Sequence, residues 1–137
     1  MKEYKAPMVQ DYRTENCVIT AVTTDKTGAT TTNLVKLCEA GSKGSKLSAI
    51  RFKCQGISVN STALIFIRKN AGVYLLFDEL TLTAIDSSST LSSEQNIALY
   101  DDLPIGSDIE IYVGITAISG IVAWNAFAIM ADYVEAT

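Results

Sequence analysis

The stretch IVAWNAFAIMADY, Ile121 to Tyr133, decides the fold of this chain. It holds the only tryptophan, Trp124, and places apolar side chains at both odd and even positions. A helix of this composition would lack a polar face. The turn residues Ser119 and Gly120 precede it, and it ends a series of strand-like runs, so we expect a strand. Alternate residues of a strand point to opposite faces, and here both faces are apolar.

The same stretch does not suit a membrane span. Crossing a bilayer takes roughly 20 apolar residues. The best window, residues 115–130, is interrupted by Thr116, Ser119, Gly120 and Asn125. The start of the chain, MKEYKAPMVQDYRTEN, is polar and lacks the apolar core of a secretory signal. We therefore expect no membrane partner.

Composition narrows the class of protein. The chain has 137 residues, 48% of them hydrophobic and 19% charged, which suits one globular domain. A net charge of −4 argues against a nucleic-acid partner. The three cysteines form no CxxC pair, and the chain has no histidine, so a zinc site and a disulfide framework are not expected. We expect buried, reduced thiols instead.

The run KLSAIRFKCQG, residues 46–56, shows the pattern of a half-buried strand. Ile50, Phe52 and Cys54 fall on one face. Arg51 and Lys53 fall on the other face, while Leu47 is out of phase with the apolar set. The segment SDIEIYVGITA, residues 107–117, alternates in the same way.

Similar short runs fill most of the chain. TALIFIRK and VYLLFDELTLTAI are separated by the turn NAG, which predicts a hairpin. NIALYDDLPIG reads as a short strand followed by a turn at Pro104 and Gly106. The total is about eight short strands without a helix, which predicts an all-β sandwich or barrel. Residues 1–16 show neither period, so we expect an N-terminal arm over 1–16 and a β-sandwich domain over 17–137.

No motif indicates catalysis. Without histidine, the Ser-His-Asp and Cys-His arrangements are excluded, and no phosphate-binding glycine loop is present. The pair Asp101–Asp102 lacks the spacing of a calcium loop, and the neighbours Asp78 and Glu79 should point to opposite faces. We expect no catalytic residue, no metal ligand and no cofactor. A basic patch is conceivable if the strands carrying Arg51–Lys53 and Arg68–Lys69 are neighbours.

The second apolar face of the opening stretch must meet a loop, the arm or another subunit, because one face alone meets the core of a sandwich. We favour a subunit contact. The expected oligomer interface consists of Val122, Trp124, Ala126, Ala128 and Met130. The arm is a candidate tether to a partner through five residues, namely Tyr4, Pro7, Met8, Val9 and Tyr12.

Four segments together resemble small structural proteins of tailed bacteriophages and prophages. They are AGSKGSKLSAI (Ala40–Ile50), ALIFIRKNAGVYLLFDELTL (Ala63–Leu82), LPIGSDIEIYV (Leu103–Val113) and WNAFAIMADY (Trp124–Tyr133). The resemblance covers roughly residues 18–133 and lies in hydrophobic and turn positions. The closing segment here is more apolar than the glycine-bearing ending of that group.

This resemblance implies a jelly-roll-like antiparallel β-sandwich without enzymatic activity. It implies a virion protein, made in the cytoplasm of the bacterial host, which decorates or cements a capsid or forms the base of a head fibre. Its expected partners are copies of itself, commonly as a trimer, and the major capsid protein or other virion proteins. The alternative is a receptor- or glycan-binding module of a tail or fibre, with Trp124 as the first candidate for a ligand platform.

Overall fold

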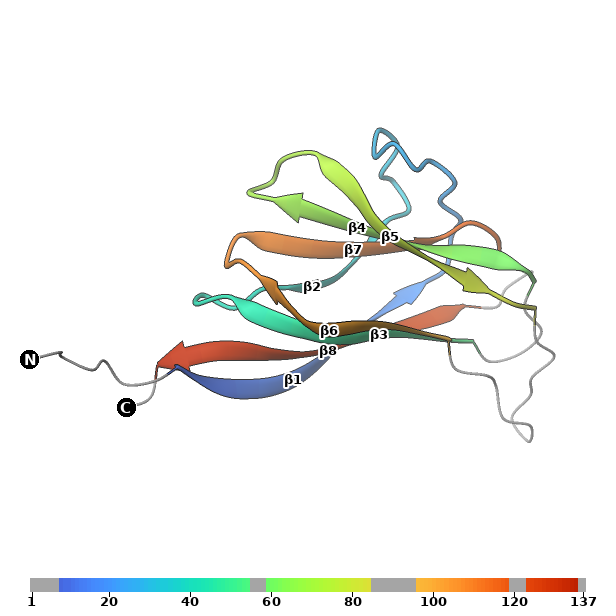
Figure 1. Ribbon diagram of the computed structural model, residues 1–137. Coiled ribbons are helices and arrows are strands. Elements are labelled where there is room, and N and C mark those ends of the chain that lie inside the picture. Colours follow the sequence, from blue (N-terminus) through green and yellow to red (C-terminus); the bar gives the residue numbers. More distant parts are fainter. Residues whose placement is uncertain (1–7, 55–58, 85–95, 119–122, 136–137) are drawn as a thin grey trace, which may run out of the picture.

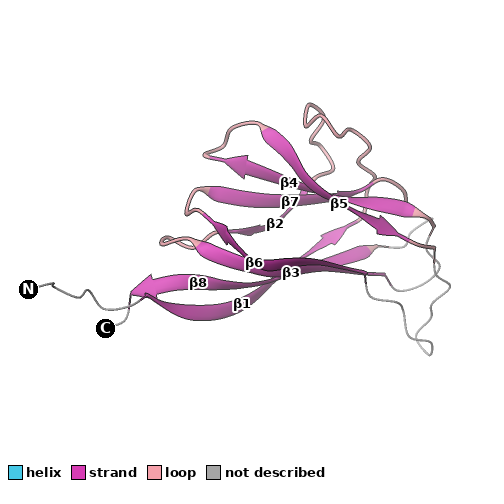
Figure 2. Ribbon diagram, in the orientation of Figure 1, coloured by secondary structure: helices cyan, strands magenta, loops and turns pink. Residues whose placement is uncertain are grey.

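Two four-stranded sheets pack face to face in the computed structural model, which describes residues 8–54, 59–84, 96–118 and 123–135 (Figures 1 and 2). The eight strands are β1 (Met8–Ile19), β2 (Val35–Glu39), β3 (Ser45–Cys54), β4 (Ser61–Lys69), β5 (Tyr74–Leu82), β6 (Asn96–Ile105), β7 (Ile109–Ile115) and β8 (Trp124–Glu135). All strand pairs within the sheets are antiparallel. The predicted all-β sandwich of about eight strands is confirmed. The described part of the chain holds no helix long and apolar enough to span a bilayer.

The strand order follows a simple rule. The first sheet has the order β1-β8-β3-β6, and the second has the order β2-β7-β4-β5. Strands whose numbers add up to nine are therefore paired: β1 with β8, β2 with β7, β3 with β6 and β4 with β5. This is the order produced by folding one long hairpin of four strand pairs across two sheets, which is the jelly-roll arrangement. Strand β8 lies inside the first sheet, between β1 and β3.

The core lies between the inner faces of the two sheets. Ile50, Phe52 and Cys54 of β3 face Ile111 and Val113 of β7 across it, and all five are buried. The predicted alternation of both strands is confirmed, since Arg51 is exposed and Lys53 is half-buried on the opposite face of β3. Antiparallel strands with one face on a core produce this pattern.

A bulge explains why Leu47 is out of phase. The register of β3 against both β8 and β6 shifts between Leu47 and Ala49. One extra residue reverses the direction of all side chains before it. Leu47 is consequently fully buried in the same core as Ile50.

The hairpin of β4 and β5 turns at Asn70 and Ala71, as the segment NAG predicts. Both residues have positive φ angles, 50° and 56°, and the Gly72 amide donates to the Lys69 carbonyl at 2.9 Å. Two consecutive left-handed residues make a type I′ turn, whose twist matches that of the flanking strands. The Arg68 guanidinium donates to the carbonyls of Ala71 and Gly72 and holds this turn.

Two boundaries differ from the prediction. Strand β1 begins at Met8, so the sandwich includes residues 8–16 of the expected arm, which pair in regular register with β8. The arm remains a prediction for residues 1–7, which lie outside the described residues. Strand β6 runs through Pro104 to Ile105, and its turn follows at Gly106. Proline is tolerated there because β6 is an edge strand.

Candidate interaction surface

The outer face of the first sheet differs from an ordinary solvated sheet face, because it carries large apolar side chains. Its side chains come from β1, β8, β3 and β6 and align in rows, because the strands pair in register. One row contains Asn16, Phe127, Arg51 and Ile97, the next contains Thr14, Ile129, Ala49 and Leu99, and a shorter row contains Val18, Asn125 and Lys53. We call these eleven residues the outer patch.

The outer patch exposes large apolar side chains to solvent. Leu99 is 80% exposed and Val18 is 49% exposed. Phe127 and Ile129, on the central strand β8, are only half-buried. Tyr12 extends the patch along β1 and is 73% exposed. Single exposed apolar residues are ordinary, but a contiguous set across a sheet marks an interaction surface.

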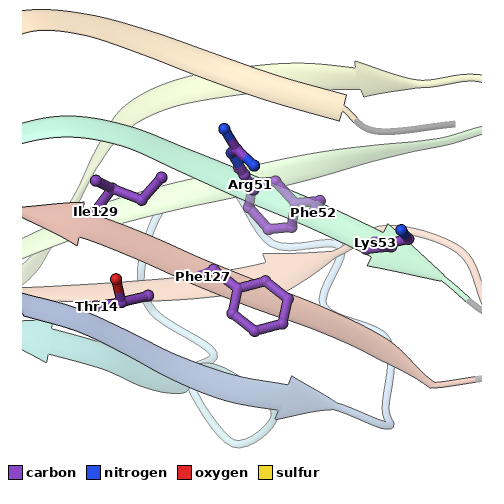
Figure 3. A pocket seen from close by; sticks show the side chains of 6 residues that line it. All are labelled: Thr14, Arg51, Phe52, Lys53, Phe127 and Ile129. Atoms are coloured by element: carbon purple, nitrogen blue, oxygen red, sulfur yellow. The ribbon is translucent and has the colours of Figure 1, made fainter.

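A shallow depression of about 320 Å³ lies within the patch, lined by Thr14, Arg51, Phe52, Lys53, Phe127 and Ile129 (Figure 3). The Phe127 and Ile129 side chains project from β8, and Arg51 and Lys53 belong to the neighbouring strand β3. The depression therefore combines an apolar floor with cationic groups at one side. Among the described residues that line it, no pair of carboxylates is available for acid-base chemistry.

The outer face of the second sheet has a different environment, because residues 20–34 lie against it (Figure 1). The Gly114 position of β7 is within 3.0 Å of side-chain atoms of Thr23 and Leu34, measured from where a Cβ would stand. Lys26 forms an ion pair with Glu79 of β5 at 2.5 Å. Leu64 and Phe66 point outward from β4 and are nevertheless fully buried. The chain thus covers one outer face by itself.

Side-chain hydrogen bonds hold that covering segment in shape. The Asp25 carboxylate accepts from the amide and hydroxyl of Thr27, at 2.8 and 2.6 Å, and from the Thr30 amide at 2.7 Å. These bonds, led by the Thr27 hydroxyl, lower the pKa of Asp25 to about 2. These hydrogen bonds hold the loop in a defined conformation. In the part of the chain that the structure describes, no comparable segment covers the first sheet.

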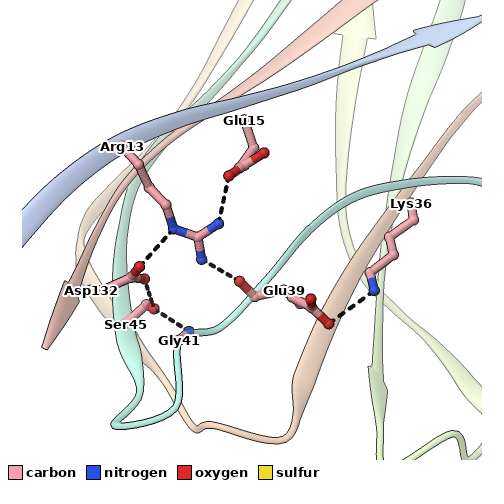
Figure 4. A network of polar contacts seen from close by, with 7 residues as sticks. All are labelled: Arg13, Glu15, Lys36, Glu39, Gly41, Ser45 and Asp132. Atoms are coloured by element: carbon pink, nitrogen blue, oxygen red, sulfur yellow. Dashed lines mark hydrogen bonds and ion pairs between the residues drawn. The ribbon is translucent and has the colours of Figure 1, made fainter. Parts of the chain in front are cut away.

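A polar network joins β1, β8 and the β2–β3 connection at one edge of the sandwich (Figure 4). The Arg13 guanidinium pairs with Asp132 at 2.9 Å and Glu15 at 2.7 Å, and it also donates to the Glu39 carbonyl. The Ser45 hydroxyl donates to Asp132 at 2.5 Å. Each charged group has a partner inside the chain, so we assign the network a structural role.

The structure corrects the face assigned to the oligomer interface. Trp124, Ala126, Ala128 and Met130 are buried in the core of the sandwich, and Val122 lies outside the described residues. Their side chains pack against the second sheet, because two large side chains, Trp124 and Met130, and two small ones, Ala126 and Ala128, together fit a tightly packed interior. The other face of β8 points outward. An oligomer interface on this strand remains a prediction, and only its outer face is available for one.

The burial of Trp124 also removes it as a ligand platform, since only 2% of it is exposed. Among the arm residues, Tyr4 and Pro7 lie outside the described residues. Met8 and Val9 belong to β1, and the structure describes their backbone only. Tyr12 is exposed at the end of the outer patch.

The two basic pairs do not meet. Arg51 and Lys53 are on β3 of the first sheet, whereas Arg68 and Lys69 are on β4 of the second. Sequence reasoning missed the outer patch itself. One signal could have identified it: Asn125 shares a face with Phe127 and Ile129, and a polar residue marks the face that meets water.

The acidic residues and thiols that the structure describes show no catalytic arrangement. Asp78 accepts from the Tyr100 hydroxyl at 2.8 Å, while Glu79 points the other way to Lys26, as their adjacent positions predict. Burial raises the pKa of Cys17 to about 11 and that of Cys38 to about 12, so both thiols stay protonated and unreactive at neutral pH. Among the described residues, no group of acidic residues and cysteines could hold a metal ion.

Comparisons with known proteins give structural matches only. No protein-family model and no curated protein matches the sequence. The chain is similar to one in the cyanophage Pam1 capsid asymmetric unit, with 11% identity over 98% of this chain and 91% of that chain, at a TM-score of 0.49. It is also similar to a chain in the structure of infectious bursal disease virus Gx strain. That match has 12% identity over 95% of this chain and 30% of the other, at a TM-score of 0.33.

Proposed function

We propose that this chain is a structural protein of a tailed-bacteriophage virion. Its role is that of a capsid decoration or cement subunit, or a subunit of a head-fibre base, which oligomerises and binds the capsid surface. The observation that carries the proposal is the outer patch, where Leu99, Phe127 and Ile129 present apolar surface on a sheet that the described chain leaves uncovered. Such a surface is suited to burial against another protein.

Two further observations support this role. The strand order is a jelly roll, an architecture that viral coat proteins share with lectins and cupins. A fold alone does not define a function. Among these roles, the virion role is favoured by a resemblance to phage structural proteins in Ala40–Ile50, Ala63–Leu82, Leu103–Val113 and Trp124–Tyr133. Glu79, Glu110 and Asp102 form ion pairs with lysines, and Asp78 accepts a hydrogen bond from Tyr100, which supports a structural role for these four carboxylates.

The experiment is the protein composition of purified particles of the encoding phage. We expect the chain in the virion at a fixed ratio to the major capsid protein, and retained after density-gradient purification. Light scattering behind a sizing column, over a dilution series, then gives its own oligomeric state, for which we propose a trimer. A chain absent from purified particles, and found only in the host cytoplasm, contradicts the virion role.

A receptor- or glycan-binding tail module is the second candidate. The depression beside Phe127 favours it, because an aromatic ring next to the polar groups of Thr14 and Arg51 is a common feature of sugar sites. A glycan array probed with the purified chain distinguishes this role. Binding that is lost in Phe127→Ala would favour it, and no binding to any glycan would exclude it for the glycans tested.

A further inference from the structure

We propose that the outer patch is the surface by which the chain docks on the capsid, and that the capsid surface it meets is apolar and carries carboxylates. This inference rests on the virion role proposed above. It assigns one of the two broad faces of the sandwich to the partner and gives the chemistry of the surface that it fits.

The apolar part of the argument comes from the rows of the patch. Phe127 and Ile129 are adjacent on the outer face of the central strand, and Leu99 and Ile97 continue their rows at the β6 edge. The patch thus spans all four strands and contains a shallow depression. An apolar face that extends across a whole sheet fits another protein surface better than an isolated small molecule.

The charges of the patch indicate the charge of the partner's surface. Arg51 is exposed and Lys53 is half-buried, and neither takes part in an ion pair within the described part of the chain. Lys46, on the same strand, is different because it pairs with Asp102 at 3.5 Å. Two unpaired cations beside an apolar surface favour a partner with acidic groups, since complementary charges determine orientation and binding partner.

A second copy stacked face to face is a poorer occupant. The three rows of the patch contain two cations and no carboxylate. Two identical patches brought together would leave Arg51 and Lys53 without an acidic group in either patch, at the moment when contact removes their water. The charges therefore favour a different protein over a two-fold dimer through this face.

The test measures binding of the full chain to capsids of the encoding phage isolated without it, by co-sedimentation over a range of chain concentrations. Leu99→Asp and Arg51→Glu change exposed side chains of the patch. Lys43→Glu is the matched control, because it reverses an exposed charge in the turn between β2 and β3. Thermal melts show that each variant is folded.

We expect Leu99→Asp and Arg51→Glu each to weaken the Kd about tenfold or more, and Lys43→Glu to leave it unchanged. We also expect binding of the unaltered chain to weaken as salt is added, because salt screens the charge pairs.

Three results would overturn the inference. If the unaltered chain binds capsids and both patch variants bind equally well, the patch is not the docking surface, although the virion role stands. If the variants instead lower the mass of the free chain in light scattering, the partner is a second copy. If the chain neither binds capsids nor occurs in virions, the virion role fails as well.

Discussion

Arg51 of β3 and Phe127 of β8 are register partners, and both side chains point away from the core of the sandwich. This pairing places Arg51, which has no acidic partner among the described residues, next to an aromatic ring on the same sheet face. The inner face of the same two strands, by contrast, buries Phe52 and Ala126, which are also register partners. The inner face of this strand pair thus packs in the core, and its outer face forms part of the outer patch.

Trp124→Ala should lower the free energy of unfolding by about 3–5 kcal/mol, because the indole is buried and its removal leaves a cavity. Urea denaturation gives the value. Leu99→Ala is the control, since Leu99 is 80% exposed, and its effect should stay within about 0.5 kcal/mol. Equal effects of the two changes would show that Trp124 is not part of the core.

Asp132→Ala should cost about 1–3 kcal/mol, because it removes the partner of Arg13 and the acceptor of the Ser45 hydroxyl at a half-buried site. The control is Lys69→Ala, which breaks the more exposed pair with Asp108 at 3.6 Å and should cost about 0.5 kcal/mol or less. Chemical denaturation of both variants tests this. A larger loss for the control would mean that the edge network does not stabilise the fold.

Ala71→Gly should stabilise the chain by about 1 kcal/mol, because Ala71 has a φ of 56° that glycine adopts without strain. Gly28→Ala should act in the opposite direction. Gly28 has a φ of 81°, and a Cβ there would stand 2.2 Å from the Tyr74 carbonyl oxygen. Thermal melts should therefore move up for the first variant and down for the second. Shifts of the same sign would contradict the backbone conformation of one of the two turns.

Stability should decline as the pH rises above 9.0, the ordinary thiol pKa. Burial raises the pKa of Cys17 to about 11 and of Cys38 to about 12, so the unfolded chain loses these protons before the folded chain does. The stabilisation from these thiols is fully present below pH 9.0. For the buried Cys38 thiol it falls by up to about 1.4 kcal/mol per pH unit as the pH rises toward the folded pKa, and for the partly exposed Cys17 thiol it falls by less, because solvent screens the effect. Burial and the bond to Asp78 also raise the pKa of Tyr100, which adds to the decline above its ordinary value.

Urea denaturation below and above pH 9.0 measures this slope. The same experiment on Cys38→Ala should give a shallower decline, because one of the shifted groups is gone. An identical slope in both proteins would show that Cys38 does not titrate as a buried thiol.

The sequence predicts the architecture well, because the core of a sandwich imposes alternation on every strand that borders it. Ile50, Phe52 and Cys54 alternate with Arg51 and Lys53, and the structure buries the first set and leaves the second outside. The turn NAG likewise predicts the β4–β5 hairpin. Leu47 departs from the pattern because the bulge before Ala49 reverses the phase, and a single sequence does not show where such a residue is inserted.

The candidate site was harder to predict, for a physical reason. Strand β8 is apolar on both faces, so hydrophobicity alone does not say which face meets the second sheet. The Trp124 face is buried and the Phe127 face is outward, and this choice depends on the register of β8 with β1 and β3, strands that are distant in the sequence. The covering of Leu64 and Phe66 by residues 20–34 is likewise a tertiary relationship.

The most direct test is a reconstruction, by electron cryomicroscopy, of capsids with the chain bound, taken from the phage that the proposed virion role implies. If the outer patch is the docking surface, we expect density in which the β1-β8-β3-β6 sheet lies against the capsid, with Arg51 and Phe127 at the contact and residues 20–34 pointing away from it. Density in which residues 20–34 contact the capsid while the outer patch stays exposed to solvent would contradict this proposal.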